Sequence, residues 1–344
     1  MSDETKIYYP TVSIVIPIKN RVELFSTTLD SLQAQTVSSW EAILVDDSSC
    51  PRERTKLKSL AERDSRTHLL DNRGPVYGAC PSRNLGLLSS RGEFVLFLDA
   101  DDALAPDCLQ KRLQILQTNP NLDFVVAPVV VFTASPGDSN LMWNIFNEED
   151  DLDRFTAGDS PWNTNSVLWR RSSIDRIKLR WRETSRSWQD WDFHLRALAA
   201  GLTYFRLPEP DCYWRRPTNL GSIGSNANSP IKAVNRARTL RDVIQVLVSF
   251  RKLTTVRRKN LGYLFYQQAF KSRQKHSVML KIWKTARQNG AVSAGEFWAV
   301  LLIEMMTRGV RRITIKGFIR IFPSAAYANN YFRHSRSSCG HQKR

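Results

Sequence analysis

The sequence predicts an α/β fold: a mixed, mostly parallel sheet flanked by helices, followed by a basic helical C-terminal region. Three observations predict it. Apolar runs rich in β-branched residues recur along the first 130 residues, as expected of strands buried on both faces. Segments with apolar residues at helical spacing separate these runs, which indicates right-handed βαβ units. Past residue 230 the strands give way to basic amphipathic helices.

The first part of the chain alternates the two kinds of element. Apolar stretches predict strands over residues 11–18, 39–49, 67–72 and 93–98. Amphipathic spacing, with a proline near the start of the last one, predicts helices over residues 22–36, 52–65, 80–90 and 106–117. Two strands end in acidic clusters, Asp46-Asp47 and Asp99-Ala100-Asp101-Asp102. Ligands of open α/β sheets bind outside the carboxyl ends of the strands, so we expect both clusters at one site.

The pattern changes after residue 121. The predicted elements are a strand over 122–132, an acidic and loop-rich segment over 133–165, a strand over 165–172, a helix over 187–201, and a strand with a sheet edge over 202–217. A Gly/Ser/Asn-rich loop at 219–230 marks the predicted domain boundary. We therefore expect an α/β domain over residues 1–225, a basic helical region over 226–330 and a disordered tail over 331–344.

Charge is distributed unevenly along the chain. Residues 231–344 hold 24 of the 50 Lys and Arg residues against three acidic ones, whereas residues 1–230 carry a net charge of −4. This asymmetry indicates an anionic partner surface, either a membrane or a nucleic acid.

Cysteine usage and the N-terminus bear on location. The five cysteines are scattered and form no CxxC motif, so we expect free thiols in a reducing compartment rather than disulfides or a zinc site. The N-terminus has no signal-peptide pattern, and no apolar run is long enough to span a membrane. The sequence thus predicts a cytoplasmic protein.

The stretch FLDADDALAPD, residues 97–107, places four carboxylates directly after an apolar run. Their ionised forms repel one another, so a bound cation would stabilise them. A D-x-D turn lets Asp99 and Asp101 point the same way, and Mg²⁺ or Mn²⁺ takes carboxylate oxygens as ligands. The alternative is an acidic surface turn that caps the helix beginning near Pro106.

A second acidic cluster lies in SWQDWDFHLR, residues 187–196. Its aromatic surroundings can raise the pKa of Asp190 or Asp192, and a carboxylate of that kind can act as a general base toward an acceptor hydroxyl. The alternative is an ordinary charge in the first turn of a helix.

Arginines are the candidates for phosphate binding. Arg83, in the segment SRN, carries a guanidinium suited to bidentate contact with phosphate oxygens, with an exposed helical arginine as the alternative. Arg215 and Arg216 precede the Gly/Ser/Asn-rich loop and are candidates to clamp a pyrophosphate as that loop closes.

Together these motifs closely resemble those of the family 2 glycosyltransferases, inverting enzymes of the GT-A fold. The resemblance covers roughly residues 10–225. The motifs that carry it are SIVIPIKN, QTVSSWEAILVDDSS, SRNLGLLSSRGEFVLFLDADDALAPDCL, TNSVLWRRS and QDWDFHLR. It implies transfer of a sugar from a nucleotide-diphosphate sugar donor to an acceptor hydroxyl, with inversion at the anomeric carbon.

The resemblance also implies roles for individual residues. The residues that would bind the donor nucleotide are Pro17, Ile18, Asn20, Asp46, Asp47, Arg83, Asp99 and Ala100. Arg83 would lie beside the diphosphate, and Asp99 would contact the ribose or the water shell of the metal. Asp101, with Asp99, would hold the Mg²⁺ or Mn²⁺ that bridges the diphosphate. Asp190 matches the catalytic base of the family.

Two residues depart from the family pattern. Gln189 stands where a Glu usually precedes the catalytic Asp, and Lys19 replaces an aromatic or small residue of the first loop. The sequence has no Gln-x-x-Arg-Trp motif, the mark of processive polysaccharide synthases. We therefore expect transfer of a single sugar to a saccharide or lipid-linked saccharide, in the assembly of cell-surface polysaccharides or glycans.

The basic region leaves alternatives open. Residues 298–322 pair apolar faces with Arg and Lys clusters, as helices on membrane surfaces do. One expectation is peripheral contact of residues 231–330 with the inner face of the membrane, and the other is packing against the α/β domain or in a dimer.

Two other functions compete with sugar transfer. A haloacid-dehalogenase-like phosphatase normally has its D-x-D after the first strand, whereas here at least three strands precede it. The alternative function is binding of nucleic acid through the basic region. Under the glycosyltransferase hypothesis, no nucleic-acid partner is expected.

Overall fold

The computed structural model describes residues 9–143, 145–216, 229–272, 275–306 and 333–334. The main sheet has seven strands in the order β10-β6-β9-β4-β1-β2-β3. They are β1 (Val12–Ile18), β2 (Trp40–Asp46), β3 (Thr67–Asp71), β4 (Phe94–Phe97), β6 (Phe124–Val126), β9 (Val167–Arg170) and β10 (Tyr204–Arg206). Strand β9 runs antiparallel to its neighbours β4 and β6, and the other pairs are parallel. The predicted mixed, mostly parallel sheet is confirmed.

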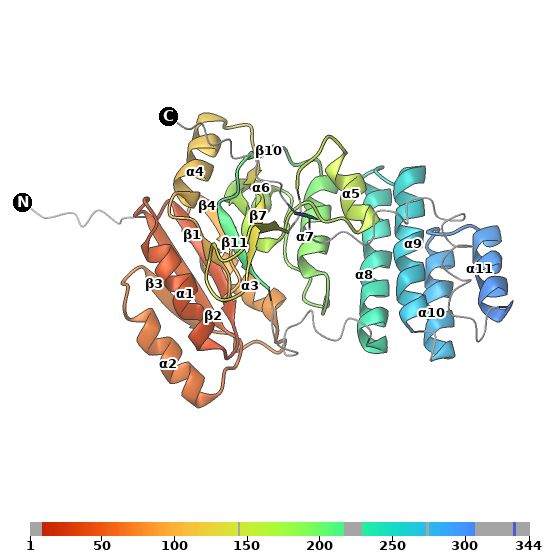
Figure 1. Ribbon diagram of the computed structural model, residues 1–344, viewed down its shortest axis with the longest axis horizontal. Helices are drawn as coiled ribbons and strands as arrows, with labels where there is room; N and C mark the ends of the chain where they lie inside the picture. Colours follow the sequence, from red (N-terminus) through yellow and green to blue (C-terminus); the bar gives the residue numbers. More distant parts are fainter. Residues whose placement is uncertain (1–8, 144, 217–228, 273–274, 307–332, 335–344) are drawn as a thin grey trace, which may run out of the picture.

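Helices cover both faces of this sheet (Figure 1). They are α1 (Val22–Gln33), α2 (Pro51–Ala61), α3 (Ala79–Ser89), α4 (Cys108–Thr118), α5 (Asp151–Ala157), α6 (Arg171–Arg176) and α7 (Gln189–Ala199). Side chains alternate along β1, so Ile14 and Ile16 face the core shared with α1 and α4, and Val15 faces the core shared with α3 and α7. Burial on both faces explains why β1 and β2 read as continuous apolar runs.

A second, smaller sheet has the order β12-β8-β7-β11-β5. Its strands are β5 (Ala103–Leu104), β7 (Val129–Phe132), β8 (Leu141–Met142), β11 (Cys212–Arg215) and β12 (Arg333–His334). The single strand predicted over residues 122–132 is wrong, because the chain passes from β6 in the main sheet to β7 in the second. Pro128 lies at the break, and a proline has no N–H to donate to a strand ladder.

Two more predictions need correction. Residues 202–217 supply β10 to the main sheet and β11 to the second sheet, with Pro208 and Pro210 between them. The segment 133–165, predicted as loop, contains β8 and α5. Asp150 caps the start of α5 by accepting from the Asp153 N–H at 2.8 Å, and Gly158 ends it with a φ of 80°.

Four helices of the C-terminal region are described, and they form a bundle beside the α/β domain (Figure 1). They are α8 (Pro230–Ser249), α9 (Thr255–Lys271), α10 (His276–Gln288) and α11 (Ala294–Met306). The bundle packs on the α/β domain through α8 against α7 and α9 against α5. The apolar core that contains Phe97 and Phe193 continues through α8 to Val300 of α11. Of the two alternatives for the basic region, packing against the α/β domain is therefore correct for α8 and α9.

Several basic side chains of the bundle face inward. Arg257 of α9 donates to Asp153 at 2.6 Å and to Asp150 at 3.0 Å, and Arg258 of α9 pairs with Glu296 of α11 at 3.2 Å. Part of the positive charge in the C-terminal third is thus neutralised within the molecule. The predicted boundary loop, nearly all of the predicted tail and most of the segment 298–322 lie outside the described residues.

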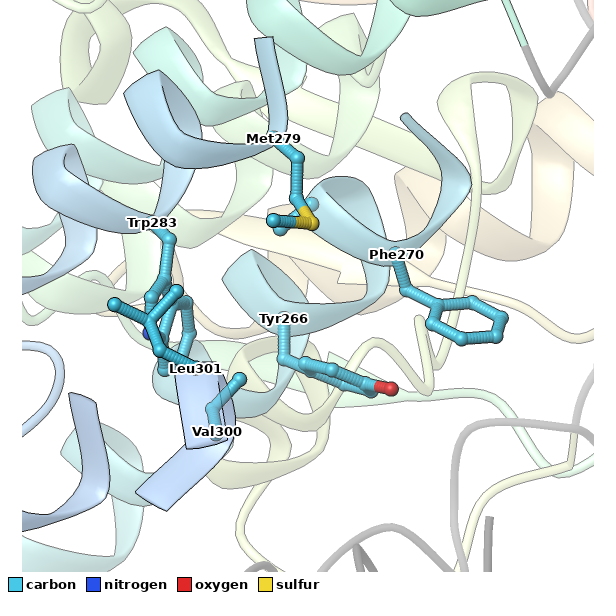
Figure 2. A pocket seen from close by; sticks show the side chains of 7 residues that line it. Tyr266, Phe270, Met279, Trp283, Val300 and Leu301 are labelled. Atoms are coloured by element: carbon cyan, nitrogen blue, oxygen red, sulfur yellow. The ribbon is translucent and has the colours of Figure 1, made fainter. Parts of the chain in front are cut away.

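A small apolar pocket opens between α9, α10 and α11 (Figure 2). Its lining consists of Tyr266, Ala269, Phe270, Met279, Trp283, Val300 and Leu301. Tyr266, Met279 and Trp283 belong to the same apolar core as the rest of the bundle, so we interpret the pocket as a packing feature. None of the helices in the described part of the chain has both the length and the hydropathy needed to span a membrane.

Candidate active site

The loops that follow β1, β2 and β4 meet at one edge of the main sheet. The parallel register pairs Ile18 with Asp46, so β1 and β2 end side by side, and β4 lies on the other side of β1. Asp47 and Asp99 therefore follow the two strands that flank β1, at the same edge of the sheet. This is the edge at which open α/β sheets bind ligands, as the sequence predicts.

The first two loops are joined by hydrogen bonds. The Asn20 backbone N–H donates to Ser49 Oγ at 2.8 Å, and the Cys50 N–H donates to Asn20 Oδ1 at 2.9 Å. Asn20, Arg21 and Ser48 have φ values of 55°, 56° and 63°. Left-handed backbone at non-glycine residues costs conformational energy, and such residues concentrate at functional sites.

Asp47 is a buried carboxylate at the mouth of this loop pair. Its Oδ1 accepts from Asn72 Nδ2 at 2.9 Å and from the Gly78 N–H at 2.8 Å. Its Oδ2 lies 3.5 Å from Lys19 Nζ, and that ammonium lies 6.0 Å from the centre of the Tyr77 ring. Lys19, which departs from the family pattern, thus supplies a cation beside Asp47, one of the residues predicted to bind the donor nucleotide.

Asp46 lies next to Asp47 but faces the chain itself. Its Oδ2 accepts from Arg54 Nη1 at 2.8 Å, and its Oδ1 accepts from the Ser49 N–H at 3.0 Å. Both oxygens are therefore engaged by α2 and by the loop. In this geometry Asp46 shapes the loop, while Asp47 lies at its mouth.

The remaining residues predicted for the first loop are strand residues. Pro17 is half-buried, and the Ile18 side chain is packed in the core. The Ile18 carbonyl accepts from the Asp47 N–H at 2.8 Å, which ties the two strand ends together. At this position the side chain serves packing, and the backbone shapes the site.

The D-x-D turn follows β4, and helix α1 holds it in place. Thr28 Oγ1, from α1, donates to the carbonyls of Ala100 at 3.0 Å and Asp102 at 2.7 Å. Burial and the neighbouring charge of Asp99 raise the pKa of Asp101 to about 6. Two carboxylates held close together in a half-buried turn fit the binding of a divalent cation.

Asp102, the third acidic residue, belongs to the framework. It is buried, and its carboxylate accepts from Asn165 Nδ2 at 3.0 Å and from the Arg215 N–H at 2.9 Å. The Arg215 guanidinium donates to the carbonyl of Asp101 at 2.9 Å and packs over Phe132 at 4.4 Å. Arg215 thereby links the second sheet to the D-x-D turn. It lies beside the site as a result of this contact.

Arg83 of α3 connects the D-x-D turn to α7. Only 4% of this residue is exposed, so the alternative of an exposed helical arginine is wrong. Its guanidinium forms an ion pair with Asp99, donates to Gln189 Oε1 at 3.2 Å, and lies 4.3 Å from the centre of the Trp181 ring. Gln189 therefore occupies the place of the family's Glu as a neutral partner of Arg83.

Asp190 is the second residue of α7, and it lies at the same site. Burial raises the pKa of its carboxyl; the charge of Arg83 lowers it and that of Asp99 raises it. All three residues therefore lie within electrostatic reach of one another. Trp188, just before α7, has a φ of 59°, a left-handed turn that directs the start of the helix. The two acidic clusters, about 90 residues apart in sequence, meet at one edge of the sheet.

Asp192 has a different environment from Asp190. It is fully buried and pairs with Arg196 at 2.9 Å and Arg182 at 3.3 Å. Two guanidiniums thus balance the charge of Asp192. Its ion pair with Arg182 connects α7 to the segment that precedes this helix.

Several supporting residues were not predicted as site residues, although Asn165 lies in the motif TNSVLWRRS. Asn72, Trp181, Asn165 and Thr28 support Asp47, Arg83, Asp102 and the D-x-D turn through the contacts described above. Asn72 follows β3 at the same sheet edge. Its place directly after a predicted strand could therefore have identified it as a site residue. The other three come from elements whose approach depends on the tertiary fold.

The described residues contain no cluster of three or more His, Cys, Asp or Glu side chains that would enclose a metal ion. Asp99 and Asp101 supply two carboxylates. Mg²⁺ sites in enzymes commonly use one or two carboxylates and leave the other positions to water and substrate phosphate. The residues present therefore fit a metal that binds together with a diphosphate.

Comparison with known proteins identifies the family. Residues 13–177 match the family model described as Glycosyl transferase family 2. The amylovoran biosynthesis glycosyltransferase AmsB of Erwinia amylovora is 27% identical over 217 residues, which cover 61% of this chain and 71% of AmsB.

Two solved structures share the fold. S. aureus TarS in complex with UDP-GlcNAc matches with a TM-score of 0.65 at 14% identity, over 92% of this chain and 91% of that chain. The mannosyltransferase PcManGT from Pyrobaculum calidifontis, in complex with GDP-Man and Mn²⁺, matches with a TM-score of 0.53 at 16% identity, over 94% and 86%. Through residues 13–177 this chain belongs to glycosyl transferase family 2, and its α/β domain has the GT-A fold.

Proposed function

We propose that this glycosyltransferase moves a sugar from a nucleotide-diphosphate sugar to an acceptor hydroxyl with inversion at the anomeric carbon. The observation that supports this best is the meeting of Asp190 with the Arg83–Asp99 pair at one sheet edge. One group there suits deprotonation of an alcohol, and the others suit a diphosphate.

The donor nucleoside occupies the loops after β1 and β2. Asn20 and Asp47 offer hydrogen-bonding groups to the base and ribose, with Asp47 as an acceptor, and the backbone of Pro17 and Ile18 forms the floor. Lys19 and Tyr77 lie beside Asp47 and offer a cation and a ring at the rim. UDP-GlcNAc and GDP-Man are bound by two proteins of this fold, which supports a sugar nucleotide as the donor class here.

The diphosphate lies beside Arg83. The buried guanidinium donates hydrogen bonds to phosphate oxygens, and stacking on Trp181 fixes its plane. Asp101 and Asp99 would hold Mg²⁺ or Mn²⁺. When bound, the cation neutralises the charge that develops on the departing nucleoside diphosphate.

Asp190 acts as the base. Its carboxylate takes the proton of the acceptor hydroxyl as the acceptor oxygen bonds to the anomeric carbon. The bond between that carbon and the diphosphate oxygen breaks on the opposite side, and its electron pair leaves with the nucleoside diphosphate. Because attack and departure occur on opposite faces, the configuration inverts.

The proposed acceptor is a saccharide or a lipid-linked saccharide in polysaccharide or glycan assembly. The similarity to AmsB, named for amylovoran biosynthesis, supports this class. We also propose peripheral contact with the inner face of the cytoplasmic membrane through the bundle. Trp298 of α11 is 67% exposed and Leu302 is 54% exposed, and Trp and Leu side chains are typical of surfaces that insert at a bilayer interface.

A donor panel tests the proposal. The purified protein is mixed with UDP-, GDP- and dTDP-sugars, with and without Mn²⁺ or Mg²⁺, and the melting temperature is measured. We expect one nucleotide class to raise it in a metal-dependent manner. Release of nucleoside diphosphate with an added saccharide acceptor, and NMR of the new anomeric linkage, then test transfer and inversion. Absence of donor stabilisation and of diphosphate release across the panel would refute the function.

Membrane contact is tested separately. Sedimentation with vesicles of anionic phospholipid, compared with neutral phosphatidylcholine vesicles, measures binding of the full chain. We expect binding to the anionic vesicles that weakens with salt and in a variant with Trp298→Ser and Leu302→Ser. Equal binding to both vesicle types would contradict it.

A further inference from the structure

The turn that carries Asp190 is held from outside the α/β domain. Arg236 of α8 donates through Nε to Ser187 Oγ at 3.0 Å, and its guanidinium carbon lies 5.1 Å from the centre of the Trp188 ring. Ser187 and Trp188 directly precede α7, whose second residue is Asp190. One side chain of the bundle thus contacts both residues of the turn that leads into the proposed base.

Arg236 is itself well fixed. Only 7% of this residue is exposed, and α8 packs against α7 along its length. Its Nη1 also lies within 3.5 Å of Oε1 of Gln268, a fully buried residue of α9. The guanidinium is therefore held in place by two helices of the bundle, and its plane is available to the Trp188 ring.

The turn needs such support because its backbone is unusual. Trp188 has a φ of 59° and a ψ of 40°, a region that bulky residues rarely adopt unless the surroundings hold them there. Its carbonyl accepts the Asp192 N–H at 3.0 Å, which starts the hydrogen-bond ladder of α7. Its ring packs against Trp191 with centroids 5.5 Å apart. The conformation of Trp188 consequently sets the direction in which Asp190 leaves the helix.

The contacts continue inward to the donor side. Gln189 donates through Nε2 to the Ser185 carbonyl at 3.0 Å and accepts from Arg83 at 3.2 Å. Arg83 in turn pairs with Asp99. The backbone of residues 185–189 therefore connects the contact with the bundle at Ser187 to the polar contacts that run from Gln189 through Arg83 to the D-x-D motif.

We propose that Arg236 is a positioning residue for the sugar-transfer step: by binding Ser187 and stacking on Trp188, it holds Asp190 in line with the acceptor hydroxyl. This inference rests on the proposed function, since Asp190 is the proposed base. The C-terminal bundle is then a working part of the active site, and its role is in the chemical step rather than in donor binding.

The test separates positioning from general support. Arg236→Met keeps the aliphatic length and removes the planar cation, and Arg236→Lys keeps a charge that reaches Ser187 but lacks the plane that stacks. Arg257→Met is the matched control, because Arg257 is equally buried in the bundle and binds Asp150 and Asp153 instead. Each variant is measured for kcat, donor KM, melting temperature and hydrogen exchange of the peptide covering residues 185–195.

We expect Arg236→Met to lower kcat by about 10- to 100-fold, because displacements near 1 Å cost this much in oriented reactions. Donor KM should stay within about 2-fold, since the loss falls on the transition state. Exchange of peptide 185–195 should become faster in this variant and stay unchanged in Arg257→Met. The kcat of Arg236→Lys should lie between that of Arg236→Met and that of the wild type.

Other outcomes are equally informative. If Arg236→Met retains wild-type kcat, or if Arg257→Met reproduces its loss of kcat, the inference is overturned. If Arg236→Met does not fold, Ser187→Ala removes the hydroxyl partner alone and should still lower kcat without changing donor KM; an unchanged kcat there overturns it too. Wild-type transfer that survives Asp190→Asn would instead refute the proposed base, and that result is independent of Arg236.

Discussion

Buried charge is arranged differently in two parts of this molecule. Where the second sheet meets α4, Arg112 and Asp211 are both almost completely buried, and the guanidinium donates to both carboxylate oxygens. At the edge of the main sheet, Arg83 pairs with Asp99 and its charge reaches Asp190, whereas burial and the charge of Asp99 raise the pKa of Asp101.

The difference distinguishes charged residues that support the fold, such as Arg112 and Asp211, from those of the candidate active site. A buried pair with matched hydrogen bonds holds elements together and has no capacity left for a ligand. Carboxylates whose pKa is raised by burial and by one another are destabilising until something cationic or a proton arrives.

Asp190→Asn gives the largest expected effect. Loss of the general base should lower transfer about 10³-fold or more, while donor binding measured by calorimetry stays intact. Asp192→Asn is the matched control, because the same change two residues away removes the partner of Arg182 and Arg196. The Asp192→Asn control should lower the melting temperature strongly and kcat only slightly. Normal turnover by Asp190→Asn would show that another group takes the proton.

Arg112→Met tests the framework side of the comparison. It leaves the Asp211 carboxylate buried without its cation, so we expect a loss of about 3–5 kcal/mol in the free energy of unfolding. Urea denaturation followed by circular dichroism measures it. Adding Asp211→Leu should recover part of the loss, because the stranded charge is then removed. A stable single variant would mean that this pair is not part of the framework.

Asp101→Asn tests the site side, and two measurements should move in opposite directions. Metal-dependent donor stabilisation should disappear, with transfer reduced about 100-fold. The metal-free variant should melt at a higher temperature than the wild type at pH 7, because a repelling charge beside Asp99 has been removed. Scanning fluorimetry with and without Mn²⁺ measures both; a lower metal-free melting temperature would contradict the comparison.

The pH dependence gives the smallest expected effect. The pKa of Asp190 is raised above its ordinary 3.8, chiefly by burial, so the base loses its ionised form at a higher pH than an exposed Asp. We expect kcat to fall as pH decreases through that raised pKa. For folding the sign is opposite: the raised pKa contributes stability below 3.8 that is lost as pH rises through the folded-state value. A kcat profile with an acid limb at the value of an exposed carboxyl would contradict this.

Much of the fold was predictable because its signals are local. The strands β1 and β2 are apolar throughout, since both faces are covered, and α1 and α7 show apolar residues at helical spacing. The transition from β6 to β7 was not predicted, because two strands in different sheets read as one apolar run. What distinguishes them is the partner strand, which residues 122–132 do not encode.

The site was predictable to the extent that it depends on strand ends. Asp47, Asp99 and Asp101 each follow an apolar run, so their convergence follows from parallel topology. The contrast between Asp46 and Asp47, or between Asp190 and Asp192, depends on which arginine approaches from another helix. Arg236 was unpredictable for the same reason: in sequence it is one basic residue among many in a region whose charge suggested an external partner.

One short strand has a practical consequence for engineering. β12 pairs with β8 at the border of the second sheet, so the chain contributes to that sheet both before the described helices of the bundle, through β11, and after them, through β12. A stop codon placed at residue 226 would therefore remove β12, a border strand of the second sheet, together with the bundle. It would also remove Arg236 and open the apolar core that the α/β domain shares with the bundle, so a minimal enzyme has to keep these helices.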